Sequence, residues 1–396
     1  MASRLRVAVC GGGNAAHVLV PAIKAASGVW VGILAPYGDE AARLSNGVSS
    51  GGIVAAYKDR EVRGGADMVT PDPRDIIPFA DIVILALPAF AHSAVVRSVL
   101  PWLKHGAWLG AMPSRSGFEF YGADPEIRAR NVTLFGFQTL PWACRIAEYG
   151  KRVVVMGRKL SVRLGARPAG MAVEICRTLQ ELIGVAFAPV ESMLSISLGN
   201  VGQIIHPGIM YGLFNGREEI AYDEGSVPPF YQSVTDESAA LLDRMSEEIL
   251  CVSKELSHKA GGRLRLRDVV SLRQWLLDSY SDQIADTSTL RSCFVSNSAY
   301  AGLKAPVVRR GPAFRPDFKA RYLTEDVPFG LVVTKGIADI CGVATPAIDQ
   351  VVTTTSRWIG AEYYAGGKPA GRHIGESRHP RNFGIDSIES LVSNAL

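Results

Sequence analysis

The first half of the chain alternates short apolar runs with stretches of helical periodicity. Runs rich in β-branched residues predict strands at residues 5–10, 29–34, 82–87, 107–111, 132–137, 153–156 and 185–188. Apolar residues at helical spacing predict helices near residues 15–26, 39–44, 92–103 and 170–182. This alternation is typical of βαβ units around a parallel sheet. The glycine-rich segment 45–63 interrupts the rhythm, and we expect it to be a loop.

After about residue 190 the pattern changes to longer stretches at helical spacing. They cover residues 191–205, 237–257, 266–282, 330–341 and 347–363, and runs of β-branched residues become rare. A length of 396 residues exceeds one ordinary core and suits two domains. The predicted fold class is therefore α/β plus all-α. Residues 1–190 form a Rossmann-type parallel-sheet domain, and residues 191–396 form an all-helical domain.

Composition and charge exclude several classes of protein. Hydrophobic residues make up 47% and charged residues 20%, as in a globular protein. The net charge of +4 comes without a concentrated basic stripe, so no nucleic-acid partner is expected. The longest apolar run, residues 82–91, is about half of a membrane span, and residues 1–6 lead into the first strand without an apolar signal core. Six scattered cysteines lack metal-binding or redox spacing, so we expect reduced thiols, no metal and a cytoplasmic location.

A glycine-rich turn follows the first predicted strand and opens the first predicted helix. It has the pattern G-x-G-x-x-A, formed by Gly11, Gly13 and Ala16. Gly11 would allow the tight turn, Gly13 would let a pyrophosphate approach the helix N-terminus, and Ala16 would keep helix and strand close. The alternative is a strand-to-helix turn that merely needs small residues. At this place in an alternating half, the pattern favours dinucleotide binding.

The choice of nicotinamide rests on the end of the second strand. Asp39 and Glu40 come slightly late for binding ribose hydroxyls, and Arg43 comes late for binding a 2′-phosphate. The lack of a well-placed cation favours NAD(H). After the strand at 82–87, Pro88 begins a loop that we expect to line the nicotinamide side, while His92 is more simply explained as a cap of the next helix.

In the second half, one histidine has suggestive surroundings. His206 is followed by Pro207 in a glycine-containing segment, which suggests a helix interrupted at a pocket. Reduction of a carbonyl or imine needs a proton donor, a cation for the substrate carboxylate, and a group that fixes the imidazole tautomer. His206, Arg321 and Asp326 could supply these three roles, although spacing alone does not show that they converge.

Four segments together resemble the opine dehydrogenase family, which includes octopine, tauropine and alanopine dehydrogenases of marine invertebrates. They are residues 11–17 (GGGNAAH), 138–145 (QTLPWACR), 200–208 (NVGQIIHPG) and 321–328 (RYLTEDVP). The resemblance implies NADH-dependent reductive condensation of pyruvate with an amino acid to an opine, regenerating NAD in anaerobic glycolysis. It also implies roles for the matching residues: proton transfer by His206, its orientation by Asp326, carboxylate binding by Arg321, cofactor binding by Asn14 and Ala15, and substrate binding by Gln138 and Cys144.

Gln138 departs from the pattern of arginine-using members, in which an acidic residue at this position helps bind the guanidinium group. A neutral amide cannot offset a buried guanidinium, so a small uncharged partner is favoured: taurine, β-alanine, alanine or glycine. Alternatively, Gln138 only packs beneath the site, or Glu148 supplies the acid and the enzyme uses L-arginine.

Two other functions suit the same domain plan. A 2-keto-acid or 2-hydroxy-acid reductase of the ketopantoate type would need a catalytic lysine, and Lys254, Lys304 and Lys335 do not stand in a matching motif. A non-catalytic dinucleotide sensor is disfavoured by the presence of His206, Arg321 and Asp326.

Overall fold

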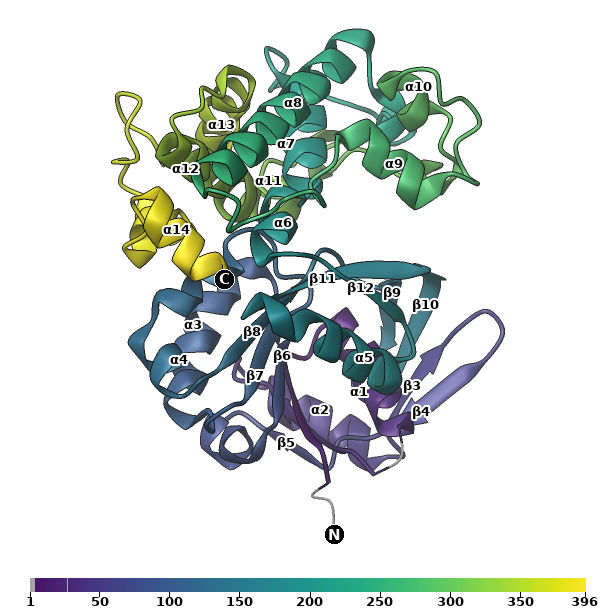
Figure 1. Ribbon diagram of the computed structural model, residues 1–396. Coiled ribbons are helices and arrows are strands. Elements are labelled where there is room, and N and C mark those ends of the chain that lie inside the picture. Colours follow the sequence, from purple (N-terminus) through teal and green to yellow (C-terminus); the bar gives the residue numbers. More distant parts are fainter. Residues whose placement is uncertain (1–3, 27) are drawn as a thin grey trace. The chain divides into compact units, whose positions relative to one another are not determined.

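The chain folds as two units. The computed structural model describes residues 4–26 and 28–396. Residues 1–3, which belong to the segment predicted to lead into the first strand, lie outside the described residues. Unit 1 comprises Met1–Ser197 together with Val392–Leu396, and unit 2 comprises Leu198–Leu391 (Figure 1).

The main sheet of unit 1 has eight strands in the order β12-β11-β8-β7-β6-β1-β2-β5. All neighbours from β5 to β8 pair in parallel, β11 pairs antiparallel with β8, and β12 pairs parallel with β11. The Rossmann-type parallel sheet is thereby confirmed. The strands are β1 (Arg6–Cys10), β2 (Trp30–Leu34), β5 (Met68–Thr70), β6 (Ile82–Leu85), β7 (Trp108–Ala111), β8 (Thr133–Phe137), β11 (Ser161–Arg167) and β12 (Ala186–Pro189).

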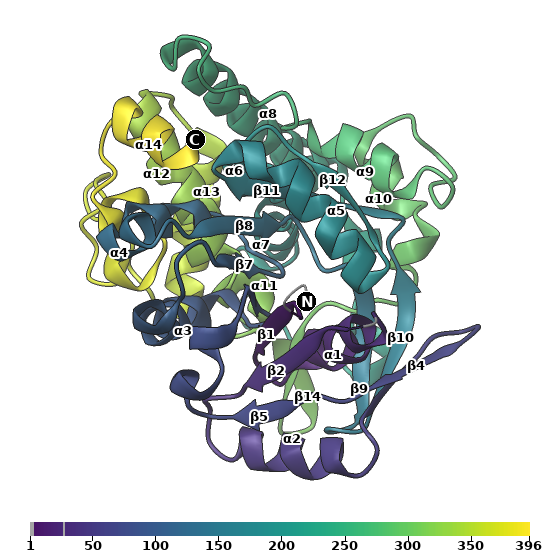
Figure 2. The same cartoon turned by 60° about the horizontal axis from the view of Figure 1, so that its bottom comes forward.

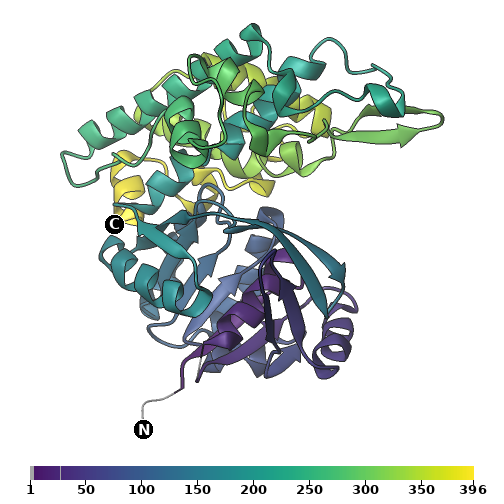
Figure 3. The same cartoon turned by 90° about the vertical axis from the view of Figure 1, so that its right-hand side faces the viewer.

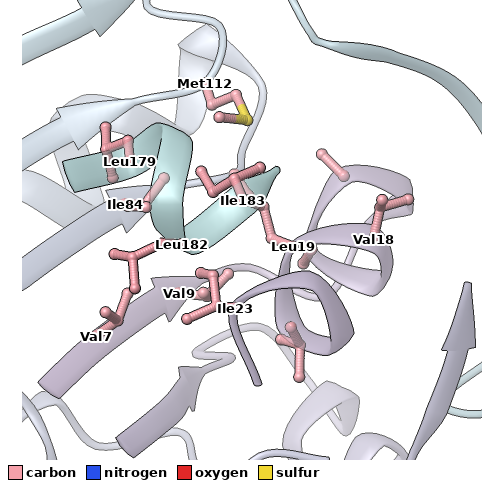
Figure 4. Close-up of a cluster of buried hydrophobic side chains, with 14 of the residues drawn as sticks. Val7, Val9, Val18, Leu19, Ile23, Ile84, Met112, Leu179, Leu182 and Ile183 are labelled. Carbon is pink, nitrogen blue, oxygen red and sulfur yellow. The ribbon is translucent and has the colours of Figure 1, made fainter. Parts of the chain in front are cut away.

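Apolar side chains from the sheet and its helices form the core of this unit. Figure 4 shows part of one buried cluster, to which Val9 of β1, Leu19 and Ile23 of α1 (Asn14–Ala25) and Leu182 of α5 (Ala172–Ile183) belong. Leu19 and Ile23 are fully buried, and each such side chain stabilises the fold by about 1.5–3 kcal/mol. This packing holds the start of α1 at the carboxyl end of β1. The remaining helices of the unit include α2 (Glu40–Ser49), α3 (Ala89–Val99), α4 (Pro125–Ala129) and α6 (Met193–Leu198).

A second sheet corrects two predictions. Its order is β4-β3-β10-β9, and α1 contacts all four of its strands (Figure 2). The strands are β3 (Ile53–Ala56), β4 (Glu61–Gly64), β9 (Trp142–Glu148) and β10 (Arg152–Arg158). The strand predicted at 153–156 therefore belongs to this sheet and not to the parallel one.

The prediction of a loop at residues 45–63 is wrong. These residues form the end of α2 and the hairpin of β3 and β4. Its glycines reflect close packing and not turns alone. A Cβ on Gly47 would lie 2.6 Å from the backbone of Gly150, and one on Gly64 would lie 2.7 Å from the Lys24 Cβ.

Unit 2 is helical, as predicted, with one short hairpin of β13 (Val307–Arg310) and β14 (Ala313–Pro316) that stands away from the helices in Figure 3. Its helices are α7 (Gly202–Phe214), α8 (Asp236–Lys259), α9 (Leu272–Tyr280), α10 (Leu290–Val295), α11 (Arg321–Thr324), α12 (Val332–Cys341) and α13 (Pro346–Ile359), and α14 (Ile388–Ala395) crosses the division between the units. Within the described residues, no helix is long and apolar enough to span a membrane.

The expected interruption of a helix at Pro207 is wrong. α7 runs through Pro207, and the break lies earlier, between α6 and α7 at residues 199–201. Proline removes one backbone hydrogen bond from a helix. Here the buried residues Ile205, Ile209 and Met210 pack α7 into the unit, and this packing outweighs the loss.

Candidate active site

The glycine-rich turn of unit 1 has the geometry that a dinucleotide requires. Gly11 adopts φ +111°, and a Cβ there would lie 2.6 Å from the Leu87 side chain, so only glycine fits. Gly13 is the N-cap of α1, and a Cβ on it would meet no protein atom within 4 Å. The backbone N–H groups that start α1 are therefore approachable by an anion. The side chains of Ala15 and Ala16 are buried and bring α1 close to the sheet.

The turn is also anchored to the second sheet. His17 lies within 3.0 Å of the Gly13 carbonyl through Nδ1, and its Nε2 accepts a hydrogen bond from the Gly150 N–H at 2.8 Å. Nε2 is an acceptor, so Nδ1 carries the proton, and burial lowers the pKa of this imidazole, which keeps it neutral. The Asn14 Oδ1 accepts from the Ile146 N–H at 2.8 Å. The side-chain oxygen of Asn14 therefore binds the second sheet, and its backbone N–H is one of those at the start of α1.

The loop after β6 follows the glycine turn at the same edge of the sheet. Pro88 is the N-cap of α3, and the Ala86 N–H donates to the Cys10 carbonyl at 2.9 Å. His92 is fully buried in the first turn of α3, where Nε2 lies 3.0 Å from the Leu87 carbonyl oxygen. The loop is therefore held beside the glycine turn, and the role of Pro88 at the cofactor stays a prediction.

In unit 2, the structure brings His206 and Asp326 together. The Nδ1 of His206 lies 2.8 Å from Oδ2 of Asp326, although 120 residues separate them. Asp326 is 1% exposed and the His206 side chain 18% exposed. A carboxylate only accepts hydrogen bonds, so Nδ1 carries the proton and the other ring nitrogen, Nε2, is the one that can exchange a proton with a substrate.

Arg321 forms an ion pair with an acidic neighbour. Its Nε and Nη2 donate to Oε2 of Glu325 at 2.9 and 2.5 Å, four residues along the chain. Glu325 is 1% exposed, whereas the Arg321 side chain is 59% exposed. The buried carboxylate fixes one edge of the guanidinium, and the exposure of the rest leaves donors for a substrate anion.

Aromatic rings enclose the imidazole of His206. Tyr322 of α11 stacks on it with 4.1 Å between ring centroids and 6° between planes. The Tyr231 hydroxyl lies 3.2 Å from Nε2, and Phe230 packs at 6.3 Å. Nε2 of His206 therefore lies among aromatic side chains in a partly buried position, where electrostatic interactions are stronger than in water.

Known proteins resemble this chain over nearly its whole length. The family described as NAD/NADP octopine/nopaline dehydrogenase, alpha-helical domain, matches residues 189–359. An opine dehydrogenase of Haliotis discus hannai is 32% identical over 99% of this chain and 100% of its own. The chain belongs to the opine dehydrogenase family. The resemblance carried by the four sequence segments is thereby confirmed.

Other members of the opine dehydrogenase family define what the relatives do. A tauropine dehydrogenase of Arabella iricolor is 32% identical over 97% of this chain and 99% of its own. Solved structures of octopine dehydrogenase with NADH and L-arginine or pyruvate are 32% identical, cover 98% of both chains and match with TM-scores of 0.91 and 0.89. Members of the family are NAD-dependent oxidoreductases acting on CH–NH groups.

The residues predicted to contact the substrate from unit 1 lie in different environments. Gln138 directly follows β8 at the carboxyl edge of the sheet, and its N–H donates to the Arg163 carbonyl at 3.0 Å. Cys144 is 8% exposed on the face of β9 that packs into the core, and burial raises the pKa of its thiol to about 11. The position of Gln138 suits a ligand at that edge, whereas contact of a substrate with the neutral Cys144 thiol would require part of the core to open.

Glu40, which comes slightly late in the sequence for a residue that binds ribose hydroxyls, lies beside the glycine turn. Tyr149 donates a hydrogen bond to Oε1 of Glu40 at 3.0 Å, and a Cβ on Gly12 would lie 2.6 Å from each of these oxygens. Burial, and then the Glu40 charge, raise the pKa of the Tyr149 phenol, so it remains a donor. Arg43 stacks on Tyr149 at 4.2 Å and lies 3.4 Å from Asp39.

Sequence reasoning missed three groups of the site: Glu325, Tyr231 and Tyr322. The spacing of Arg321 and Glu325 is that of an ion pair on one helical face, so this pair had a local signal. Tyr231 had none, because only the fold brings it to His206. Within the described residues, no group of three or more histidine, cysteine or acidic side chains is arranged to hold a metal.

Proposed function

We propose that this protein catalyses the NADH-dependent reductive condensation of pyruvate with a small amino acid that has no charged side chain. The observation that carries the proposal is the partly buried hydrogen bond between His206 and Asp326. It supplies a histidine with a defined tautomer inside the helical domain of a dehydrogenase family. Residues 1–190 would bind the dinucleotide, and residues 191–396 would supply the proton-transfer groups.

The chemistry assigns a separate task to each side chain. The amine of one substrate and the ketone of the other lose water to form an imine, and bound NADH supplies the hydride that reduces it. His206 would deliver the proton from Nε2 while Asp326 holds Nδ1–H and stabilises the imidazolium. Arg321 would bind the pyruvate carboxylate with the guanidinium donors that Glu325 does not occupy.

The geometry around the glycine turn supports NAD(H) over NADP(H). Gly11, Gly13, Asn14, Ala15 and Ala16 would hold the pyrophosphate at the start of α1, where helix N–H groups favour an anion. The Glu40 carboxylate beside the turn could accept hydrogen bonds from ribose hydroxyls and would repel a 2′-phosphate. Arg43 is already stacked on Tyr149 and close to Asp39.

Gln138 supports the small uncharged amino partner. The other candidate for an acid, Glu148, is exposed and forms an ion pair with Lys151 at 2.6 Å. It ends β9, whereas Gln138 precedes the start of that strand. A seven-residue strand is roughly 20 Å long, and this separation argues against Glu148 as the source of the carboxylate that Gln138 lacks. Taurine, β-alanine, alanine and glycine remain the candidate partners, with L-arginine as the alternative.

An amino-acid panel tests this proposal. NADH oxidation would be followed with saturating pyruvate and each amino acid in turn, on wild type and on Gln138→Glu, and then repeated with NADPH. We expect a small uncharged amino acid to give the highest kcat/KM, with NADH preferred. Gln138→Glu should raise the activity with L-arginine relative to the small amino acids, because a carboxylate offsets the guanidinium charge.

Three results would contradict parts of the proposal. Highest activity with L-arginine on wild type would show that Gln138 does not exclude a guanidinium. A higher kcat/KM with NADPH would point to Arg43 as a phosphate ligand. No NADH oxidation with any amino acid, despite NADH binding, would favour the dinucleotide sensor.

A further inference from the structure

The hydroxyl of Tyr231 lies within hydrogen-bonding distance of Nε2 of His206. Asp326 binds Nδ1, so proton exchange must occur at Nε2, and the Tyr231 oxygen lies 3.2 Å from that atom. The pairing joins two segments of unit 2, α7 and the turn Tyr231–Ser233. A substrate oxygen or nitrogen that receives the proton must approach the same atom, so Tyr231 is a neighbour of the reacting group.

The position of the Tyr231 ring does not depend on His206. The ring stacks on Tyr300 with 4.0 Å between centroids and 16° between planes, and it meets Phe230 edge-on at 4.9 Å. Tyr231 is 8% exposed. Aromatic pairs of this kind hold a ring in one orientation. The hydroxyl is therefore presented to His206 by a rigid cluster.

The Tyr231 phenol pairs with the neutral state of the His206 imidazole. When His206 is neutral with its proton on Nδ1, the bare Nε2 accepts a hydrogen bond from the Tyr231 O–H. When His206 is protonated, Nε2–H donates to the substrate, and the Tyr231 hydroxyl, which also pairs with Tyr322, no longer donates to Nε2. Burial raises the pKa of Tyr231 well above its usual value, so the hydroxyl keeps its proton throughout.

We propose that Tyr231 is a positioning residue for proton transfer, which directs Nε2 of His206 and stabilises the bare nitrogen once its proton has passed to the substrate. This inference rests on the proposed role of His206 as the acid. Asp326 favours the protonated ring and Tyr231 favours the neutral ring, so the two partners act in opposite directions. Tyr231 therefore supplies a partner for Nε2 when the proton leaves that atom.

Few ionisable groups in the described part of the chain face the imidazole. Asp326, Tyr231 and Tyr322 contact it, and next to them Arg321 and Glu325 form their own ion pair. The helices on the other faces of α7 meet it through uncharged groups: α8 places Leu242 and Met245 against Gly208, and α13 places Gln350 and Trp358 against Tyr211. Removal of the Tyr231 hydroxyl therefore changes one of a small set of interactions.

The test is the titration of His206 itself, followed by 15N NMR of histidine-labelled full-length protein, with the signal assigned by its loss in His206→Gln. Tyr231→Phe keeps the stacked ring and removes only the hydroxyl. We expect the titration midpoint of His206 to rise by roughly half to one pH unit, because the neutral ring loses a donor. Asp326→Asn should lower it. The kcat of reductive condensation should fall by roughly three- to tenfold in Tyr231→Phe, with the KM for NADH unchanged.

Tyr280→Phe is the matched control. It removes a phenol hydroxyl from the same aromatic cluster, where Tyr280 packs edge-on against Tyr300 at 5.4 Å, and should leave the His206 midpoint and kcat unchanged. An unchanged or lower midpoint in Tyr231→Phe would overturn the proposal, as would an equal effect of Tyr280→Phe. Because the NMR titration needs no substrate, the expected rise together with full activity of His206→Ala would count against His206 as the acid and not against the contact.

Discussion

At the scale of single residues, the chemistry depends on which atoms of His206 are already engaged. An isolated neutral imidazole carries its proton on either nitrogen, so either nitrogen can face a substrate. The 2.8 Å contact with Asp326 removes that freedom, because a buried carboxylate accepts only from Nδ1–H. Stacking by Tyr322 then fixes the plane of the ring. The proposed acid is therefore oriented before any substrate binds, which lowers the entropic cost of reaction.

Replacement of His206 and replacement of Asp326 should both lower activity, for different reasons. His206→Ala should lower kcat by about 10²–10⁴-fold, the usual contribution of a general acid, while NADH affinity is retained because the glycine turn is untouched. Asp326→Asn should also be impaired, and the pH above which activity falls should decrease, because the imidazolium loses its anionic partner. Steady-state kinetics from pH 5 to 9, with fluorescence titration of NADH, measure both.

His258→Ala serves as the control for these variants. His258 is an exposed histidine near the end of α8, and its replacement should leave kcat unchanged. Near-normal kcat in His206→Ala would show that this histidine is structural.

At the scale of elements, a buried histidine connects the segment that follows α13 to α12. His379 is 4% exposed, its Nδ1 accepts from the Arg381 N–H at 3.2 Å, and its Nε2 lies 3.2 Å from the Tyr364 hydroxyl. A Cβ on Gly336 of α12 would lie 2.6 Å from Nε2, so helix and segment are in close contact. Burial lowers the pKa of His379 to about 4. The neutral ring is therefore part of the folded structure.

This histidine makes stability depend on pH. Its folded pKa of about 4 lies below the ordinary value of 6.5, so the unfolded chain binds more protons between these pH values. The stabilisation is fully present above pH 6.5 and is lost as pH falls toward 4, by up to about 3 kcal/mol. Urea unfolding of wild type and His379→Gln at several pH values isolates the effect. The wild-type advantage should shrink as the pH falls, and a constant difference would refute the assignment.

At the scale of the whole molecule, the chain does not divide into two consecutive pieces. Val392–Leu396 belong to unit 1, although they are the last residues of the sequence. Val392 is fully buried, Ala395 is 1% exposed, and the Asn394 side chain accepts a hydrogen bond from Arg128 of α4 at 3.4 Å. Unit 1 is therefore completed only after unit 2 has been synthesised.

Truncation should reveal this dependence. A chain that ends at Leu391 loses the buried Val392 and the contact with Arg128, which should destabilise unit 1 by about 2 kcal/mol or more. A lower thermal unfolding midpoint and faster amide exchange in α4 would report it. Removal of Leu396 alone, which is 41% exposed, should have little effect. Equal stability of the two truncated chains would argue that the terminal residues do not support unit 1.

The sequence by itself determined the features that depend on neighbouring residues. The order β1, glycine turn, α1 lies within 25 residues, and its apolar periodicity and small residues encode it locally. The helical character of residues 236–259 and the residue types of the site, His206, Arg321 and Asp326, were likewise predictable, whereas the continuation of α7 through Pro207 was not.

Only the tertiary structure decided which distant segments meet. The pairing of β3 with β10, about 100 residues apart, turned an expected loop into part of a second sheet. The fold also placed Glu40 beside Gly12, Tyr231 on His206, and Val392 in unit 1. Periodicity reports on which side of an element is buried, whereas the choice of partner depends on the packing free energy of the whole chain, and no local pattern contains it.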